Sequence, residues 1–426
     1  MRTRISLTTF GLVAMLLCAC GGGGSAFGDG GGGGDDSGGV YDSTNPIFNT
    51  DGGVGDGGCV NLQCQQSCAS TQISGYVYDP KGTVPLYNVF VYVPNAPLDP
   101  ITSGPVCTAC QAPASGSPVV SATTDETGHF VLPNVPDGDN IPLVLQLGKW
   151  RRVVTLPHVQ PCIDNHYNTK ASPKDSSVES LLRMPKKQGE GSPNDNIPLI
   201  AVTTGSCDYG ECFLLNTIGI DIKEFNSGGR VQVYDGSGGE TPPHSYGSAL
   251  TNLWNNASNM NKYDIIFASC ECNDYDRGSG YTNMANYLNG GGRFFATHYM
   301  YNFFASASQC SGDVSCKGPT DFNSVAQWNG GGYDNDSPPY YVDQTFPKGL
   351  SMAKWLLNVG TSTTLGRIDS LYDLRHDVDA VNKPKATRWL YSGSQNSTPY
   401  KTLYMSFNTP VANQPANQCG RAVFSD

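Results

Sequence analysis

Between residues 70 and 156 the chain repeats a short pattern, in which a few alternating apolar and polar residues are followed by a turn signal. Alternation with a period of two residues is typical of a strand with one buried face, and β-branched and aromatic residues favour it. Turns rich in Gly, Asp and Pro, such as residues 79–82 and 125–128, separate the runs. Turns at this spacing predict an antiparallel β-sandwich for residues 59–156. The expected strands are residues 73–78, 88–93, 129–132, 141–147 and 151–156.

The pattern changes at residue 197, where predicted strands and helices begin to alternate. Residues 197–203 are continuously apolar, as in a strand that is buried on both faces. Between such runs, apolar side chains recur at intervals of three and four residues, the spacing of one helix face. This alternation predicts a parallel sheet with helices on both sides for residues 197–426, joined to the sandwich by a linker at 157–196. Further expected strands are residues 231–234, 263–268 and 293–297; the helical positions are Leu250, Leu253, Trp254 and Ala257, then Tyr281, Met284, Ala285 and Leu288.

The first residues have the three-part layout of an export signal. Arg2 and Arg4 precede an apolar run at residues 10–17, which is too short to span a bilayer. Residues 17–20, Leu-Cys-Ala-Cys, resemble the lipobox of bacterial lipoproteins, in which the last cysteine, here Cys20, is lipidated. The resemblance implies a signal peptide at 1–19, and Gly21 in place of Asp implies the outer membrane, at the cell surface or the periplasmic face. The alternative is an ordinary signal peptide that is cleaved nearby.

A glycine-rich segment follows the lipidation site. Residues 20–58 are mainly Gly with Asp and Ser, so burial could not offset the entropy of ordering them, and we expect a disordered tether. The chain has 26 basic and 37 acidic residues, a net charge of −11. An acidic chain without a basic stripe argues against nucleic acid as a partner. The expected partners are the membrane, through the lipid anchor, and a polysaccharide or another surface protein.

The chain contains 15 cysteines, mostly in polar, loop-like sequence. In an exported protein this pattern indicates disulfides. Loss of Cys18 with the signal and use of Cys20 for the lipid leave an odd number. Either one thiol is free or a partner is missing, and we expect that the partner of Cys419 was lost with a truncated C-terminus. Cys310 and Cys316 bracket a short polar turn and are expected to pair. The expected disulfide cysteines are Cys59, Cys64, Cys68, Cys107, Cys110, Cys162, Cys207, Cys212, Cys270, Cys272, Cys310 and Cys316.

Cys107 and Cys110 have an alternative assignment. Two cysteines at this spacing are half of a zinc site, and Cys59, Cys64 or Cys68 would have to complete it. Disulfides are favoured over zinc because the chain is exported.

A motif in the first segment has the form of a known family. Its residues are Gly75, Val77, Asp79, Gly82, Pro85, Leu86, Val89, Val91, Thr124, Asp125, Gly128, Phe130, Pro136 and Gly138. They resemble the carboxypeptidase-regulatory-like domain, which implies a Greek-key sandwich similar to starch-binding-like folds. Residues 94–120 depart from the family pattern as a long insertion. The resemblance favours a structural spacer, or carbohydrate binding through exposed aromatic side chains. The candidates are Tyr76, Tyr78, Tyr87, Tyr92 and Trp150.

Short motifs also recur through the second segment. They comprise Tyr263, Asp264, Tyr287, Leu288, residues 290–299, residues 346–350, Gly420, Arg421, Val423 and Phe424. They resemble the class I glutamine-amidotransferase-like superfamily and its ThuA-like group, which implies a flavodoxin-like three-layer α/β domain. True amidotransferases carry a nucleophilic cysteine at the turn after the fourth strand. Here that turn is Thr297-His298-Tyr299, so amidotransferase activity is not expected.

His298 is the leading candidate for a functional residue. It follows a predicted strand, and ligands of α/β folds bind beyond the carboxyl ends of their strands. ThuA-like chains also have a His at this turn. Glu271 and Asp274, in the loop after residues 263–268, are the acids expected beside it, and Asp208 and Asp235 lie at the same edge. Beside an acid, His298 would act as a base or bind a metal. The alternative is a structural histidine that is hydrogen-bonded within a loop crosslinked by disulfides.

The sequence favours a non-enzymatic surface lipoprotein with a binding or structural role, without metal or cofactor. Asp334 and Asp336 lack the acidic partner that would complete a calcium loop. The alternative is an extracellular carbohydrate-active enzyme or other hydrolase that uses the strand ends around His298. Such an enzyme would place His298 within hydrogen-bond distance of an acid in a cleft, or beside a reduced cysteine. A third possibility is a scaffold that binds surface proteins through the Tyr-rich loop at 331–341.

Overall fold

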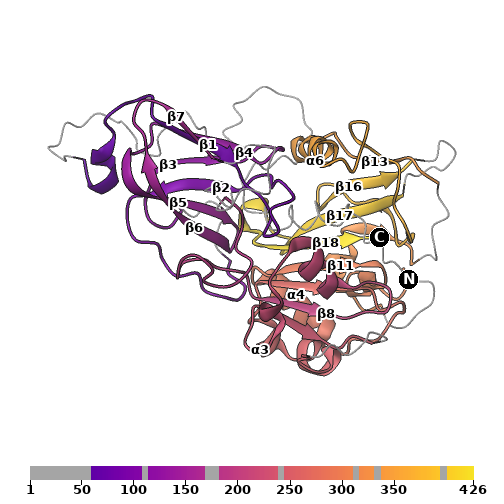
Figure 1. Ribbon diagram of the computed structural model, residues 1–426. Coiled ribbons are helices and arrows are strands. Elements are labelled where there is room, and N and C mark those ends of the chain that lie inside the picture. Colours follow the sequence, from indigo (N-terminus) through magenta and orange to yellow (C-terminus); the bar gives the residue numbers. More distant parts are fainter. Residues whose placement is uncertain are drawn as a thin grey trace.

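The computed structural model describes residues 59–107, 114–167, 182–237, 244–309, 316–330, 337–393 and 401–426. The signal segment, Cys20, the tether, Cys110, Cys310, Asp334 and Asp336 lie outside these residues. The described chain is rich in strands, which form several sheets, one of them large and mixed (Figure 1). Within the described ranges, no helix is both long enough and apolar enough to cross a membrane.

Two sheets form the N-terminal module, which we define as the described residues from 59 to 196. One sheet has the strand order β4-β1-β7 and the other has the order β3-β2-β5-β6. Ile73 and Leu132 of the first sheet and Val91 and Leu145 of the second are completely buried in the same core. The five strands expected from alternation are all present. The strands are β1 (Gln72–Tyr76), β2 (Phe90–Pro94), β3 (Pro118–Thr123), β4 (His129–Pro133), β5 (Gly138–Leu147), β6 (Trp150–Val159) and β7 (Asp164–Tyr167).

The sequence suggested a linker at 157–196, but the described parts of this range, 157–167 and 182–196, belong to the folded N-terminal module. β6 continues to Val159, and β7 pairs in parallel with β1. Farther on, Leu182 is completely buried in the core. The carboxylate of Asp195 accepts hydrogen bonds from the backbone N–H of Val153, at 2.8 Å, and from Arg152, at 3.2 Å. These contacts could not be predicted from the Pro- and Ser-rich sequence. Its few apolar residues lie in irregular chain and show no helix or strand periodicity.

A nine-stranded sheet forms the C-terminal module, which we define as the described residues from 197 onward. Its order is β14-β13-β16-β17-β18-β11-β10-β8-β9. The strands from β18 to β9 run parallel, as expected. The strands from β14 to β17 are antiparallel, so the sheet is mixed where a wholly parallel one was predicted. The parallel strands are β8 (Ile200–Thr203), β9 (Val231–Tyr234), β10 (Ile265–Ala268), β11 (Arg293–Thr297) and β18 (Gly420–Ser425).

The antiparallel strands lie in the sequence between β11 and β18. They are β13 (Tyr340–Val342), β14 (Arg367–Ile368), β16 (Ala386–Ser392) and β17 (Thr402–Thr409). β12 (Ala326–Trp328) and β15 (Val378–Val381) form a separate two-stranded sheet.

The helices of the C-terminal module are short. α4 (Gly280–Asn289) confirms the helix expected from the spacing of Tyr281 and Leu288. The helix expected from Leu250 to Ala257 is broken, because Asn256 caps a new helix with its side chain. The described helices of this module are α2 (Gly210–Cys212), η4 (Phe213–Ile218), η5 (Ile222–Phe225), η6 (Leu250–Trp254), α3 (Ala257–Met260), α4, η7 (His298–Phe303), α5 (Thr320–Asn323), α6 (Pro347–Asn358) and η8 (Pro415–Asn417), and η2 (Asn61–Gln65) lies in the N-terminal module.

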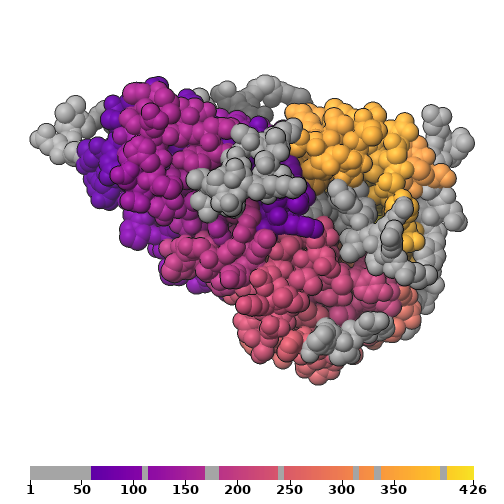
Figure 2. All heavy atoms as spheres, viewed as in Figure 1, coloured from indigo at the N-terminus to yellow at the C-terminus, as the bar shows by residue number. Residues whose placement is uncertain are grey.

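The two modules share a core. Val77 and Leu86 of the N-terminal module belong to the same buried cluster as Ile218 and Leu356 of the C-terminal module. The indole N–H of Trp355, on α6, donates to the carbonyl oxygen of Pro85 at 2.9 Å. Figure 2 shows the N-terminal module, indigo to magenta, abutting the rest of the chain over a broad region. Burial of this apolar surface opposes separation of the modules.

Candidate functional site

Loops from three neighbouring strands meet at one edge of the mixed sheet. Thr203 of β8 lies opposite Ala268 of β10, and Ala268 lies opposite Ala296 of β11. Because these strands are parallel, the loops that follow them begin side by side. The edge where they begin is the position at which open α/β sheets bind ligands.

Asp208, Cys270 and His298 come together at this edge, and we call them the edge cluster. One carboxylate oxygen, the Sγ atom and one ring nitrogen lie within 4.8 Å of one another. The Nδ1 atom of His298 lies 4.0 Å from Oδ2 of Asp208, which is longer than a hydrogen bond. The side chains of His298 and Asp208 are 16% and 30% exposed, so solvent reaches one side of the cluster.

His298 has an unusual backbone conformation. Its φ is +44°, in the left-handed region, immediately after the extended Thr297 at the end of β11. A non-glycine residue in this region is strained, and such strain collects at functional sites. The functional role of this turn stays a prediction; the structure shows that the turn carries a histidine in the left-handed region.

Cys270 is a free thiol, and the expectation that it forms a disulfide is wrong. Its side chain is completely buried. Burial raises the pKa of the thiol to about 12, and the adjacent Asp208 carboxylate adds to this effect. The backbone N–H of Cys272 lies 3.4 Å from the sulfur. Cys270 is therefore protonated at neutral pH and is a weak nucleophile as long as the site holds no cation.

A disulfide between Cys207 and Cys272 joins the loop after β8 to the loop after β10, as the sequence predicted for this pair of loops. The backbone N–H of Cys207 also donates to the carbonyl oxygen of Cys270 at 3.2 Å. Gly205 permits this approach, since a Cβ atom there would lie 2.0 Å from the carbonyl oxygen of Cys270. Cys212 was expected to take part in these crosslinks, but it is a half-buried free thiol.

Other disulfides brace the rest of the chain. Cys419 pairs with Cys107, 312 residues away, so the expected loss of its partner beyond residue 426 is wrong. Cys316 is also disulfide-bonded, and its expected partner, Cys310, lies outside the described residues. In the part of the chain that the structure describes, Cys59–Cys64 and Cys68–Cys162 are also crosslinked.

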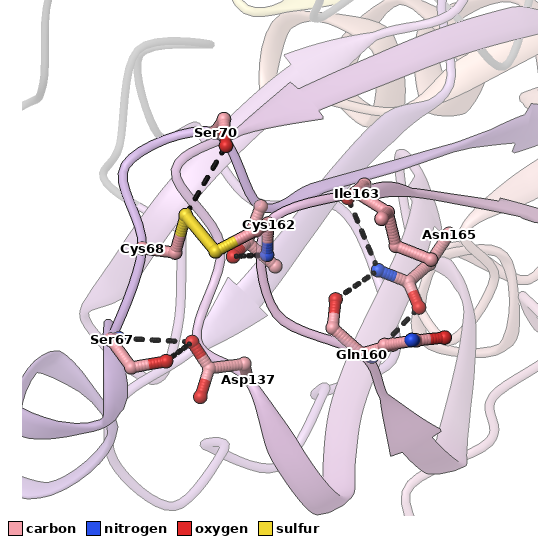
Figure 3. Close-up of a disulfide and its surroundings, with 9 residues drawn as sticks. Ser67, Cys68, Ser70, Asp137, Gln160, Cys162, Ile163 and Asn165 are labelled. Atoms are coloured by element: carbon pink, nitrogen blue, oxygen red, sulfur yellow. Dashed lines mark hydrogen bonds between the residues drawn. A yellow bond between two sulfur atoms is a disulfide. The ribbon is translucent and has the colours of Figure 1, made fainter.

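Figure 3 shows the Cys68–Cys162 disulfide and the hydrogen bonds around it. The hydroxyl of Ser70 lies 3.2 Å from the sulfur of Cys68. Below the disulfide in the same view, the backbone N–H of Ser67 donates to Asp137 at 2.9 Å. This crosslink ties the segment before β1 to the segment between β6 and β7, and so stabilises one end of the N-terminal module.

Glu271 and Asp274 were expected beside His298, but the structure gives them other partners. The Glu271 carboxylate forms a buried ion pair with Arg277, with an Nη1–Oε2 distance of 2.9 Å, and both side chains are at most 2% exposed. Burial raises the pKa of Glu271, and Arg277 opposes that shift. Asp274 accepts a hydrogen bond from the hydroxyl of Tyr301 at 3.1 Å. These acids therefore hold the loop after β10 in place.

Sequence reasoning missed a charged group beside the edge cluster. The Arg375 guanidinium lies 3.7 Å from the ring centroid of Tyr299 and donates two hydrogen bonds of 3.0 Å to Asp377. The backbone N–H of Asp377 donates to the carboxylate of Asp426, which follows β18 at the same edge. Asp426 could have been found because it closely follows Val423 and Phe424, which belong to the motif of the second segment. Arg375 and Asp377 lie in a segment without periodicity, so no signal marked them.

A groove of about 550 Å³ lies where the two modules meet, and we call it the interface groove. Amide and hydroxyl side chains line it together with the apolar Val84, Pro85 and Val359. Its one charged lining residue, Lys81, donates from Nζ to the carbonyl oxygen of Asn216 at 2.9 Å. The aromatic and polar lining residues are Tyr78, Thr83, Thr127, Asn216, Thr217 and Asn358.

Of the aromatic residues expected to bind carbohydrate, Tyr78 is the one that lines the interface groove. Tyr92 is completely buried and Trp150 is 3% exposed, so neither offers the exposed surface that the sequence suggested. Tyr76 packs against His129, with ring centroids 5.0 Å apart. Tyr87 is half-buried against the shared core.

The sequence matches no family model and no curated protein, and the structure matches no solved structure.

Proposed function

We propose that the chain is an exported, lipid-anchored protein of the outer membrane that binds a neutral polysaccharide in the interface groove. The N-terminal module would be a carboxypeptidase-regulatory-like Greek-key sandwich, and the C-terminal module a flavodoxin-like domain of the ThuA-like group, modified by its antiparallel strands. The three- and four-stranded sheets of the first module and the five parallel strands of the second support this assignment.

The disulfides support export. Pairs such as Cys68–Cys162 and Cys107–Cys419 persist in oxidising compartments and are rare in the cytosol. Lipidation of Cys20 would then hold the folded modules at the membrane, and the glycine-rich tether would separate them from its surface.

The observation that carries polysaccharide binding is the lining of the interface groove. Sugars present hydroxyl groups beside apolar C–H faces, and their binding sites combine amide or hydroxyl partners with an aromatic ring. The groove offers the amides of Asn216 and Asn358 and the ring of Tyr78. Tyr supplies an apolar face and a polar hydroxyl at a low entropic cost. Apart from the ammonium of Lys81, which donates to the Asn216 carbonyl and keeps its charge, the lining residues are uncharged, and this favours an uncharged ligand.

The edge cluster argues against the alternative of a hydrolase with a cysteine nucleophile. A reduced cysteine does lie beside His298, which the sequence analysis named as a mark of an enzyme. However, burial and Asp208 raise the pKa of Cys270 to about 12, while a nucleophilic cysteine needs a lowered pKa. The 4.0 Å between Nδ1 of His298 and Oδ2 of Asp208 is longer than a hydrogen bond, so Asp208 does not orient the imidazole as a base in this structure.

Affinity electrophoresis of the full chain in gels that contain soluble amylopectin, xylan or mixed-linkage glucan tests the proposal. We expect at least one of these polysaccharides to retard the protein. Tyr78→Ala should abolish the retardation and Asn358→Ala should weaken it. Tyr372→Ala, which changes a tyrosine that is 57% exposed and not among the lining residues of the groove, is the matched control. Absence of retardation in all three gels, or equal retardation of Tyr78→Ala, would refute polysaccharide binding in the groove.

A further inference from the structure

The edge cluster has a donor set that the proposed function does not use. Asp208, Cys270 and His298 offer one oxygen, one sulfur and one nitrogen atom, from loops after three different strands. These are the three donor types that Zn²⁺ takes in proteins, and three protein ligands with an open position are typical of its catalytic sites. Hard cations such as Mg²⁺ and Ca²⁺ prefer oxygen ligands alone, so the sulfur selects against them.

We propose that the edge cluster is a zinc site, with Asp208, Cys270 and His298 as ligands and one position open to water or a small ligand. Donor atoms around tetrahedral zinc lie about 3.3–3.8 Å apart. The separation of 4.0 Å between Nδ1 of His298 and Oδ2 of Asp208 needs only a small side-chain adjustment to reach that range. The partial exposure of these two side chains leaves a path for the ion to enter.

Hydrogen bonds to two of the three ligands are already in place. The backbone N–H of Cys270 donates to Oδ2 of Asp208 at 3.3 Å, and the hydroxyl of Thr297 donates to the same oxygen. The backbone N–H of Cys272 points at the Cys270 sulfur from 3.4 Å. Such outer contacts orient metal ligands, and N–H groups aimed at sulfur stabilise a thiolate.

A disulfide and a constrained backbone conformation also hold the three ligands in place. The disulfide between Cys207 and Cys272 holds the loops of Asp208 and Cys270 together, and the left-handed backbone of His298 directs the third loop. A site held by crosslinks and strain requires little reorganisation when the ion binds.

Zinc binding would proceed without redox change. The S–H bond of Cys270 breaks, its proton passes to the buffer, and a sulfur electron pair forms the bond to Zn²⁺. His298 binds as the neutral imidazole and Asp208 as the carboxylate. Metal binding would therefore release a proton and weaken as the pH falls.

Thiol–disulfide exchange is the competing use of Cys270. The sulfurs of Cys207, Cys270 and Cys272 also lie within 4.8 Å of one another, so Cys270 could attack the disulfide. Exchange needs an accessible thiolate, whereas this thiol is completely buried. Zinc binding is favoured because the donors are already gathered around the sulfur.

The test uses the untagged full chain in detergent with its disulfides intact. After dialysis against Zn²⁺ and then against buffer, elemental analysis should find one zinc per chain that is lost in Cys270→Ser and His298→Ala. Cys212→Ser, which removes the other free thiol and leaves the cluster intact, should retain the zinc. We expect affinity to fall at least about 100-fold in the two ligand variants.

The visible absorption spectrum of the Co²⁺-loaded wild-type chain tests the site without any variant, so the test does not depend on whether the variants fold. Co²⁺ bound at the cluster should give sulfur-to-cobalt charge-transfer absorption and the intense visible bands of a tetrahedral ion. Failure of the wild type to retain zinc, a cobalt spectrum without the sulfur band, or unchanged zinc in a folded Cys270→Ser variant would overturn the site. Formation of a Cys270 disulfide in place of metal binding would overturn it as well. Polysaccharide binding in the interface groove does not depend on these outcomes.

Discussion

The Nζ atom of Lys149 lies 2.7 Å from Oδ1 of Asp264, which joins the turn between β5 and β6 of the N-terminal module to the residue before β10. The side chain of Asp264 is 3% exposed and also accepts hydrogen bonds from the backbone N–H groups of Gly104 and Leu199. A single buried carboxylate thus links three segments of the chain. The two modules are therefore connected through a specific polar contact as well as through apolar packing.

Asp264→Ala should destabilise the protein by about 3–5 kcal/mol, because it removes the charged partner of Lys149 and the acceptor of two backbone N–H groups. Urea denaturation measures this change. A second ion pair between the modules, Lys354–Glu126, is the control. Its N–O distance is 3.7 Å and its lysine is 52% exposed, so Lys354→Ala should cost at most about 1 kcal/mol. Equal losses in the two variants would show that burial does not distinguish these contacts.

Removal of the Cys107–Cys419 disulfide by a double substitution with Ser should lower stability by about 2–5 kcal/mol, since it closes a loop of 312 residues. The matched control is the Cys59–Cys64 disulfide, whose cysteines are separated by 5 positions. The entropic effect of a crosslink grows with loop length, so removal of the Cys59–Cys64 disulfide should lower the stability by a smaller amount. Thermal unfolding of both double variants measures the two losses of stability. A larger loss in the Cys59–Cys64 variant than in the Cys107–Cys419 variant would contradict this prediction.

Asp79 should give the protein a distinctive pH dependence. Burial raises the pKa of its carboxyl group from 3.8 to about 6, despite hydrogen bonds from the backbone N–H groups of Thr83 and Val84. Because the folded-state pKa is above the unfolded one, the contribution of Asp79 is fully present below pH 4 and is lost as the pH rises through about 6.

Asp79→Asn removes this titration while an amide oxygen can still accept the two hydrogen bonds. The free energy of unfolding of the wild type, relative to Asp79→Asn, should therefore fall by roughly 2–3 kcal/mol between pH 4 and pH 7. Urea denaturation of both proteins at each pH measures the difference. A difference that stays constant or grows with pH would contradict the burial argument.

Cys20→Ser should abolish lipidation, because the thiol is the acceptor of the lipid in the expected lipobox. Incorporation of radiolabelled palmitate and fractionation of membranes measure the effect. The neighbouring Cys18→Ser is the control and should leave acylation unchanged. Acylation that persists in Cys20→Ser, or its absence from the wild type, would count against the anchor.

The parallel half of the C-terminal sheet could be predicted because each of its strands carries a local signal. The apolar run at residues 197–203 and the helix spacing of Tyr281 and Leu288 are visible within one window of sequence. The antiparallel half could not be predicted, because β16 and β17 are placed by pairing with β13 and β18. Pairing between distant strands leaves no pattern in a single window.

The disulfide pattern had a similar limit. Cysteine count and export predicted crosslinks, and the crosslink between the loops after β8 and β10 followed from the expected topology. Which thiol pairs depends on the path of each loop: the Cys207 loop reaches Cys272, whose φ is +60°, and leaves Cys270 inside. Sequence spacing alone does not determine connectivity.

The sequence placed His298 at the strand ends, where the structure has it, but it favoured Glu271 and Asp274 over Asp208 as the acids beside it. Glu271 and Asp274 were expected near His298 because they lie in the loop after residues 263–268. In the structure, Glu271 pairs with Arg277, and Asp274 accepts a hydrogen bond from Tyr301. Asp208 takes their place because the loop after β8 folds over the edge. Side-chain partners across loops depend on packing that periodicity does not encode.

The proposals of export and of a zinc site together require an oxidised, crosslinked protein in which Cys270 is a buried thiol beside His298. Peptide mapping of the unreduced native protein, with alkylation before and after unfolding, tests this most directly. We expect crosslinked peptides for Cys207–Cys272 and Cys107–Cys419, and alkylation of Cys270 only after unfolding. Recovery of Cys270 in a disulfide with Cys207, or alkylation of Cys207, Cys272, Cys107 and Cys419 without reduction, would contradict the account.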